Sequence, residues 1–154
     1  MAYVVTIETV PARILAAVRR RVRAGEVATA FRPALDQVWA FLRSNPGLRT
    51  DGHNVFHYDH ASGNPTTGFD VDFGVEVTRI FDPHGQVTCV TTPAGRAALT
   101  VHRGPYGGLS AAHAALRHWF SQNGEKIGTW SQEIYGDWQE DESKLETTIV
   151  YALG

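Results

Sequence analysis

The chain has 154 residues, of which 43% are hydrophobic and 19% charged, a composition typical of one folded domain and not of a disordered segment. The formal net charge of −2 offers no basic footprint for direct nucleic-acid binding, and a single cysteine, Cys89, excludes an internal disulfide. We find no signal-peptide pattern and no apolar run of about 20 residues, so we expect a cytoplasmic protein with no membrane span.

The first half of the chain predicts two strands, a helix and two more strands. β-Branched residues dominate the strand segments, and Pro11 separates the first two. Pro46 and Gly47 end the helix. The expected elements are strands Tyr3–Val10 and Ile14–Val22, a helix whose apolar stripe runs from Phe31 to Leu42, and strands Val55–Tyr58 and Phe69–Phe81.

The second half predicts the same succession. Ser110 is a candidate N-cap for the helix, which Asn123 and Gly124 end. The expected elements are strands Val87–Thr92 and Arg96–His102, a helix with a stripe from Leu109 to Phe120, and strands Trp130–Tyr135 and Lys144–Leu153.

The two halves, about residues 1–82 and 83–154, form an internal repeat within one domain of residues 1–154. Matching positions occur in a common order in both helices and in the strands that follow them. The matches include Ala34 with Ala112, Val38 with Leu116, Phe41 with Trp119, Leu42 with Phe120, and Tyr58 with Tyr135. The expected fold is α+β: a tandem repeat of two strand-strand-helix-strand-strand units, forming a mostly antiparallel sheet with two main helices.

The most distinctive local sequence begins with His102–Tyr106, a strand end followed by Gly-Pro-Tyr. A helix ending in Trp119–Gly124 follows, and then Glu133-Ile134-Tyr135. This succession resembles the GyrI-like effector-binding domain over nearly the whole chain. That family includes drug-sensing domains of bacterial transcription regulators as well as stand-alone proteins. This chain departs from the family in having Trp138 where a proline is common, and it contains no recognisable helix-turn-helix.

Glu133 is the first candidate for a ligand contact. On an extended strand it shares a face with Tyr135, while Trp130 and Ile134 share the other. If Trp130 and Ile134 pack toward the helices, Glu133 and Tyr135 face the space between the halves. The resemblance implies a glutamate that faces cationic aromatic ligands, and a carboxylate among aromatic rings suits such a ligand. The alternative is an exposed glutamate paired with an arginine.

Further candidates are aromatic residues. The repeat matches Tyr58 to Tyr135 and Phe56 to Glu133, which predicts a cleft that is acidic on one side and aromatic on the other. Core packing is as good an explanation as ligand contact for each aromatic side chain. The complete set of expected ligand-binding residues is Glu133, Tyr135, Tyr106, Trp119, Tyr58, Phe56 and Trp39.

No metal site or cofactor is expected. His53, His57 and Asp59 share strand parity beside His60, but their spacing matches no recognised zinc pattern. Scattered surface histidines are the simpler interpretation.

Three functions remain open. The leading one is the binding of small hydrophobic molecules, aromatic and often cationic, in the cleft between the halves. The resemblance also implies a hydrolase of cyclopropane-containing electrophilic toxins, with Glu133 as general base and Tyr135 or Tyr106 hydrogen-bonding the oxyanion. The third is a protein partner, such as a topoisomerase or a separate regulator, bound through the acidic stretch Asp137–Glu142.

Overall fold

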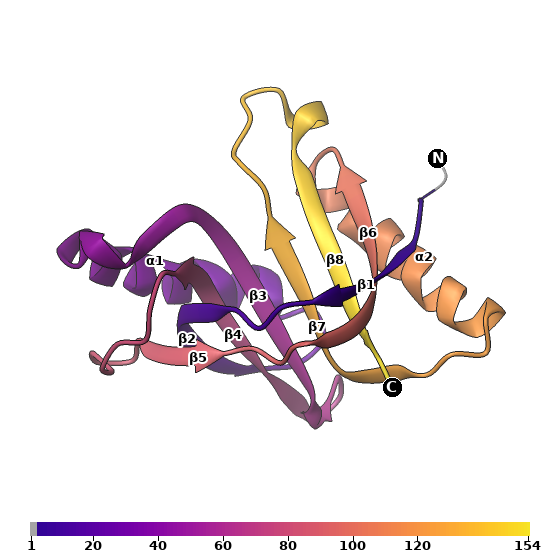
Figure 1. The fold of residues 1–154 in the computed structure, drawn as a ribbon, viewed down its shortest axis with the longest axis horizontal. Coiled ribbons are helices and arrows are strands. Elements are labelled where there is room, and N and C mark those ends of the chain that lie inside the picture. Colours follow the sequence, from indigo (N-terminus) through magenta and orange to yellow (C-terminus); the bar gives the residue numbers. More distant parts are fainter. Residues whose placement is uncertain (1–2) are drawn as a thin grey trace.

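One antiparallel eight-stranded sheet and two α-helices form the fold of the computed structural model, which describes residues 3–154 (Figure 1). The architecture is α+β, as the sequence predicts. None of the helices among the described residues is long and apolar enough to cross a membrane. The elements are β1 (Thr6–Val10), β2 (Ile14–Val22), α1 (Val27–Ser44), η1 (Pro46–Leu48), β3 (Arg49–Asn64), β4 (Gly68–Val77), β5 (Thr88–Thr91), β6 (Gly95–Arg103), η2 (Tyr106–Gly108), α2 (Leu109–Gln122), β7 (Ile127–Tyr135), η3 (Glu142–Lys144) and β8 (Glu146–Leu153).

The strand order across the sheet shows the relation between the two halves. The order is β1-β6-β8-β7-β3-β4-β2-β5, and exchanging β1–β4 with β5–β8 reverses it. A pseudo-two-fold axis therefore runs between β3 and β7 at the centre of the sheet. The first strand of each half pairs with the second strand of the other half, β1 with β6 and β5 with β2. Each half thus completes the sheet of the other.

The axis passes through one pair of residues, Phe56 on β3 and Glu133 on β7. These two residues lie directly opposite each other, and they are also equivalent in the repeat. The register continues in both directions as a buried row across six strands, in which Glu133 alone carries a charge. The row consists of Val18, Phe73, Phe56, Glu133, Ile149 and Thr100.

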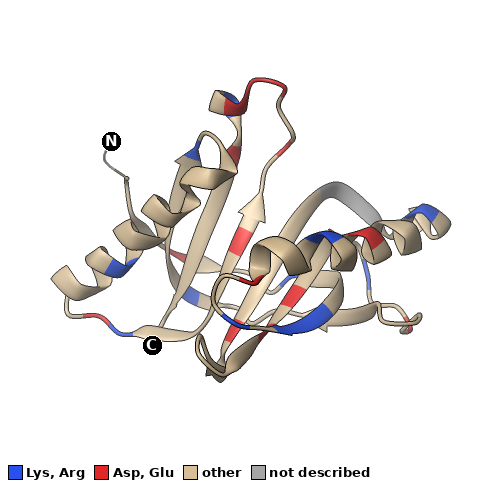
Figure 2. Cartoon of the chain, turned by 180° about the vertical axis from the view of Figure 1, so that it is seen from behind, with Lys and Arg blue, Asp and Glu red and all other residues tan. Residues whose placement is uncertain are grey.

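Both α-helices cover the same face of the sheet, one over each half (Figure 2). Their buried positions recur at three- and four-residue spacing, as expected of amphipathic helices packed on a sheet. Figure 2 also shows acidic and basic residues interspersed over the helices and the sheet. The buried residues are Ala34, Leu35, Val38 and Leu42 on α1, and Ala112, Leu116 and Phe120 on α2.

Several strand boundaries differ from the sequence prediction. β4 ends at Val77 and not at Phe81, and β7 begins at Ile127 and not at Trp130. β1 begins at Thr6 and not at Tyr3, whose hydroxyl instead bonds His102 Nδ1 at 2.8 Å. β3 spans Arg49–Asn64, well beyond the predicted Val55–Tyr58. Pairing with β4 continues from Arg49 to Asn64, whereas pairing with β7 covers only Val55–Asp59. Long-range ladder hydrogen bonds to β4 therefore extend the strand through residues of low strand propensity.

The start of α2 also differs. Ser110 is not its N-cap. The helix begins at Leu109, and its N-cap residue, Gly108, has no side chain to cap it. The 3-10 helix η2 leads directly into α2, so the backbone already turns before Ser110 is reached.

The sheet face away from the helices is also buried in large part, because the sheet coils until the segments after its two edge strands meet (Figure 1). There the backbone N–H of Thr92 donates to the carbonyl of Arg13 at 2.8 Å. Trp130 and Ile134 pack on this reverse face. The expectation that they face the helices is therefore wrong. Glu133 and Tyr135, of opposite parity, share the helix-covered face.

His57 is a buried polar residue of the reverse face, with 7% of its surface exposed. Its Nδ1 lies 3.1 Å from the amide nitrogen of Gln132, and its ring packs against Trp130 at a centroid distance of 5.8 Å. Burial lowers the pKa of His57 below its ordinary value of 6.5, and the neighbouring Asp72 opposes this shift only in part.

The lowered pKa of His57 predicts that the folded protein loses stability in mild acid. Below pH 6.5 the unfolded chain binds a proton at His57 that the folded chain refuses until a lower pH, so the free energy of unfolding falls over that interval. We expect His57→Gln to make this decline shallower in urea unfolding measured from pH 7.5 to 5. The exposed His118, changed to glutamine, is the control. Parallel pH profiles for wild type and His57→Gln would contradict the assignment.

Candidate functional site

Glu133 lies on the helix-covered face of β7 and is 7% exposed. The hydroxyl groups of Tyr58 and Tyr135 both donate to its Oε1, at 2.5 and 2.8 Å, and His113 Nε2 lies 2.6 Å from its Oε2. Tyr58 and Tyr135 are repeat equivalents on either side of the axis. Two symmetric donors thus converge on a carboxylate that only the second half supplies.

The hydrogen bonds keep this carboxylate ionised. Burial raises the pKa of Glu133, but hydrogen bonds from His113 and Tyr58, the Coulombic attraction of His113 and the hydrogen bond from Tyr135 together outweigh burial and hold the pKa below the ordinary value of 4.5. An ionised carboxylate only accepts hydrogen bonds, so His113 carries a proton on Nε2. Burial and the nearby Glu133 raise the pKa of both tyrosines, which remain donors.

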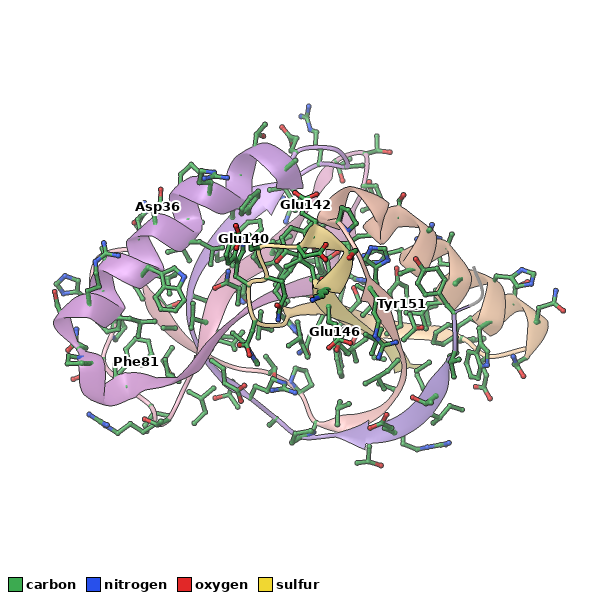
Figure 3. The ribbon with its side chains drawn as sticks, turned by 90° about the horizontal axis from the view of Figure 1, so that it is seen from above. Asp36, Phe81, Glu140, Glu142, Glu146 and Tyr151 are labelled. Carbon is green, nitrogen blue, oxygen red and sulfur yellow. The ribbon has the colours of Figure 1, made fainter. Side chains whose placement is uncertain are left out.

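A second layer of hydrogen bonds fixes the ring of His113. Its Nδ1 lies 2.7 Å from the hydroxyl of Tyr151, which also accepts a 3.5 Å hydrogen bond from Arg117. Figure 3 shows Tyr151 between β8 and α2, near the middle of the second half. This series of hydrogen bonds, from Arg117 through Tyr151 and His113 to Glu133, orients the imidazole toward the carboxylate.

Two adjoining pockets open on this face, between the helices. The carboxylate lobe has a volume of about 850 Å³, and its lining includes Tyr58, His113, Arg117, Glu133 and Tyr151. The aromatic lobe has a volume of about 560 Å³, and its lining includes Phe31, Leu35, Trp39, Phe56 and Trp138. Both lobes share Val27, Tyr106 and Tyr135. We call the two lobes together the cleft.

The cleft brings together six of the seven residues expected from the sequence. Glu133 and Tyr58 line the carboxylate lobe, Phe56 and Trp39 line the aromatic lobe, and Tyr106 and Tyr135 line both. The alternative of an exposed Glu133 paired with an arginine does not match its burial and its three partners.

Trp119 does not line the cleft. It borders a separate depression between α2 and the segment before β1, with Tyr3 and Val5. The reason is helical phase: Trp119 follows the cleft-lining Arg117 by two residues, about 200° around the helix. The first-half residue equivalent to Arg117 is Trp39, which does face the cleft.

Several cleft residues were not expected from the sequence, above all His113, Arg117 and Tyr151. His113 lies four residues after Leu109 and four before Arg117, so the three share one side of α2. A histidine and an arginine beside an apolar helical stripe were the available signal. The sequence carries no such signal for Tyr151, because its contact with His113 depends on the packing of β8 under α2.

The histidines considered as metal ligands make separate hydrogen bonds, and the expectation that they lie on the surface is wrong for His57, which is buried. His53 Nε2 lies 2.9 Å from Asp137, and His60 Nε2 lies 2.8 Å from Ser131. Among the side chains that the structure describes, those of residues 3–48 and 53–154, no three His, Cys, Asp or Glu residues come together as metal ligands would.

Comparisons with known proteins relate this fold and cleft to a family. The sequence matches the family profile described as the GyrI-like small molecule binding domain over residues 3–153. Comparison with curated proteins gave no significant match. The C-terminal domain of EcmrR has a similar structure, with 25% identity and a TM-score of 0.81; the alignment covers 100% of this chain and 99% of that one. EcmrR solved in a DNA complex also matches, at 24% identity, and this chain covers 57% of that longer chain.

Two more distant structures share the fold. SAV2435, solved bound to tetraphenylphosphonium, is 11% identical with a TM-score of 0.66, covering 100% of this chain and 94% of that one. A hydrolase from Listeria innocua is 11% identical with a TM-score of 0.61, covering 97% of this chain and 91% of that one.

Proposed function

This chain belongs to the family of GyrI-like small molecule binding domains, and from that premise we propose that its cleft binds hydrophobic aromatic cations. The observation that carries the proposal is the buried, ionised carboxylate of Glu133 facing a cleft lined with aromatic rings. Coulomb attraction to a cation is stronger there than in water, because the site is partly desolvated. The rings of Tyr58, Tyr106 and Phe69 add apolar area and negative ring faces.

One structural neighbour was solved with a ligand of this class. SAV2435 was solved with tetraphenylphosphonium, a lipophilic aromatic cation, whereas the C-terminal domain of EcmrR supports the fold alone. The absence of direct nucleic-acid contact stays a prediction for this chain, since EcmrR was solved with DNA.

The direct test compares two ions of the same shape and opposite charge. We expect tetraphenylphosphonium to bind saturably with one-to-one stoichiometry, and tetraphenylborate to bind at least about tenfold more weakly, because Glu133 repels an anion. Isothermal titration calorimetry measures both dissociation constants and the stoichiometry. Equal affinities for the two ions, or no binding of the cation, would refute the proposal.

Hydrolysis is the second candidate, because a structural neighbour is a hydrolase. A general base must take up a proton, whereas three hydrogen bonds lower the pKa of Glu133 and weaken it as a base. The geometry therefore favours binding. Multiple turnovers of a cyclopropane-containing electrophile, lost in Glu133→Gln, would reverse this preference.

A further inference from the structure

The two lobes of the cleft are related by the internal repeat. Apart from Val27, which lines both lobes, the residues of α1 that line the aromatic lobe correspond one by one to residues of α2 that line the carboxylate lobe. The corresponding pairs are Phe31 and Leu109, Arg32 and Ser110, Leu35 and His113, and Trp39 and Arg117. On the central strands, Phe56 and Glu133 correspond in the same way. The same backbone frame therefore supplies two lobes with different chemistry.

The aromatic lobe attracts a cation less strongly than the carboxylate lobe, because its lining does not include the buried carboxylate of Glu133. Arg32, on its rim, lies over the Phe31 ring at 5.8 Å and places a positive charge there. Its acidic residue, Asp137, is bonded to His53 at 2.9 Å. The walls are flat rings: Phe56 packs against Tyr135 at 4.9 Å, and Trp138 is 75% exposed beside the lobe. Flat apolar walls with a nearby positive charge suit a neutral planar group.

One contact divides the lobes. The rings of Tyr106 and Tyr135 meet edge to face at 5.4 Å, and both line each lobe. Tyr135 is fixed by its hydrogen bond to Glu133, whereas Tyr106 is 42% exposed on the short helix η2. Because Tyr106 is partly exposed, rotation of its side chain toward solvent would let a narrow linker pass from one lobe to the other.

We propose that the aromatic lobe is a second subsite for a neutral planar aromatic group, so that the preferred ligand has two ends joined by a narrow linker. The cationic end lies in the carboxylate lobe. The planar end lies in the aromatic lobe, on the other side of the Tyr106–Tyr135 contact. Each lobe lies in the size range of a complete small-molecule pocket, roughly 300–1,000 Å³. This inference rests on the proposed function for the cationic end alone.

The test uses two phosphonium probes. The parent probe is butyltriphenylphosphonium, and the two-ended probe carries a naphthyl group at the end of the same butyl chain. We expect the two-ended probe to bind about tenfold more tightly, still one to one, because it adds a buried aromatic contact. The gain in affinity is expected to fall severalfold in Phe31→Ala and in Trp138→Ala, because each change weakens binding of the two-ended probe more than binding of the parent probe. Trp138 is exposed, so its variant tests the lobe without disturbing the core. Trp119→Ala, which changes a different depression, is the matched control.

The outcomes separate the two proposals. If the parent probe does not bind, the proposed function fails. If the parent binds but the naphthyl probe binds no more tightly, or keeps its advantage in both Phe31→Ala and Trp138→Ala, the second subsite is refuted. Binding of two parent cations per chain would also refute it, because the aromatic lobe would then accept a cation.

Discussion

Replacing Glu133 with glutamine is expected to lower the affinity for tetraphenylphosphonium by roughly 10- to 100-fold. The change removes the only negative charge in the buried central row, next to the bound cation. Affinity for an uncharged aromatic ligand of similar size should change little, because the ring contacts persist. Calorimetric titration of both ligands into wild type and variant measures the difference.

The variant is expected to fold, because the hydrogen bonds can rearrange around the amide. The amide oxygen still accepts from Tyr58 and Tyr135, and the amide nitrogen donates to Nε2 of His113 once the imidazole proton moves to Nδ1. The N–H at Nδ1 then donates a hydrogen bond to the hydroxyl oxygen of Tyr151. Glu146→Gln, on the exposed side of β8, removes an equal charge outside the cleft and serves as control. An equal loss of cation affinity in both variants would show a general charge effect instead of a site.

Much of the central site could be predicted, because the repeat and the two-residue period of strands are local patterns. The repeat equates Phe56 with Glu133, and strand parity places Tyr135 on the face of Glu133. Those two relations correctly anticipated a carboxylate opposite an aromatic ring. The α+β fold class followed from the order of strands and helices, and the structure confirms it.

The sequence could not settle which face of the sheet the helices cover, since both faces of the central strands carry apolar residues. Trp130 and Ile134 are as hydrophobic as the residues beneath the helices, and they are buried by the coiling of the sheet instead. Trp119 shows a second limit. An amphipathic stripe identifies the buried side of a helix, but the residues that face a cleft lie along the edge of that stripe. There, two residues only two positions apart point to different sides of the helix, as Arg117 and Trp119 do.

The buried row also supports the cleft mechanically. Phe73 is fully buried beside Phe56, with their rings edge to face at 4.8 Å. Ile149 is fully buried in the equivalent place beside Glu133. The two residues are repeat equivalents, so they offer a matched pair of truncations under the two lobes.

We expect Phe73→Ala to lower the free energy of unfolding by about 3–5 kcal/mol and Ile149→Ala by about 2–5 kcal/mol, as large-to-small changes in close-packed cores do. Phe73 loses more atoms and the edge-to-face contact with Phe56. Urea unfolding followed by far-UV circular dichroism measures both variants. Val101→Ala, on the 39% exposed Val101 of β6, should change stability by less than about 0.5 kcal/mol and is the control. Losses below about 1 kcal/mol in both core variants would mean that the central row is not close-packed, and the cleft would then lack the rigid floor on which ion pairing at Glu133 depends.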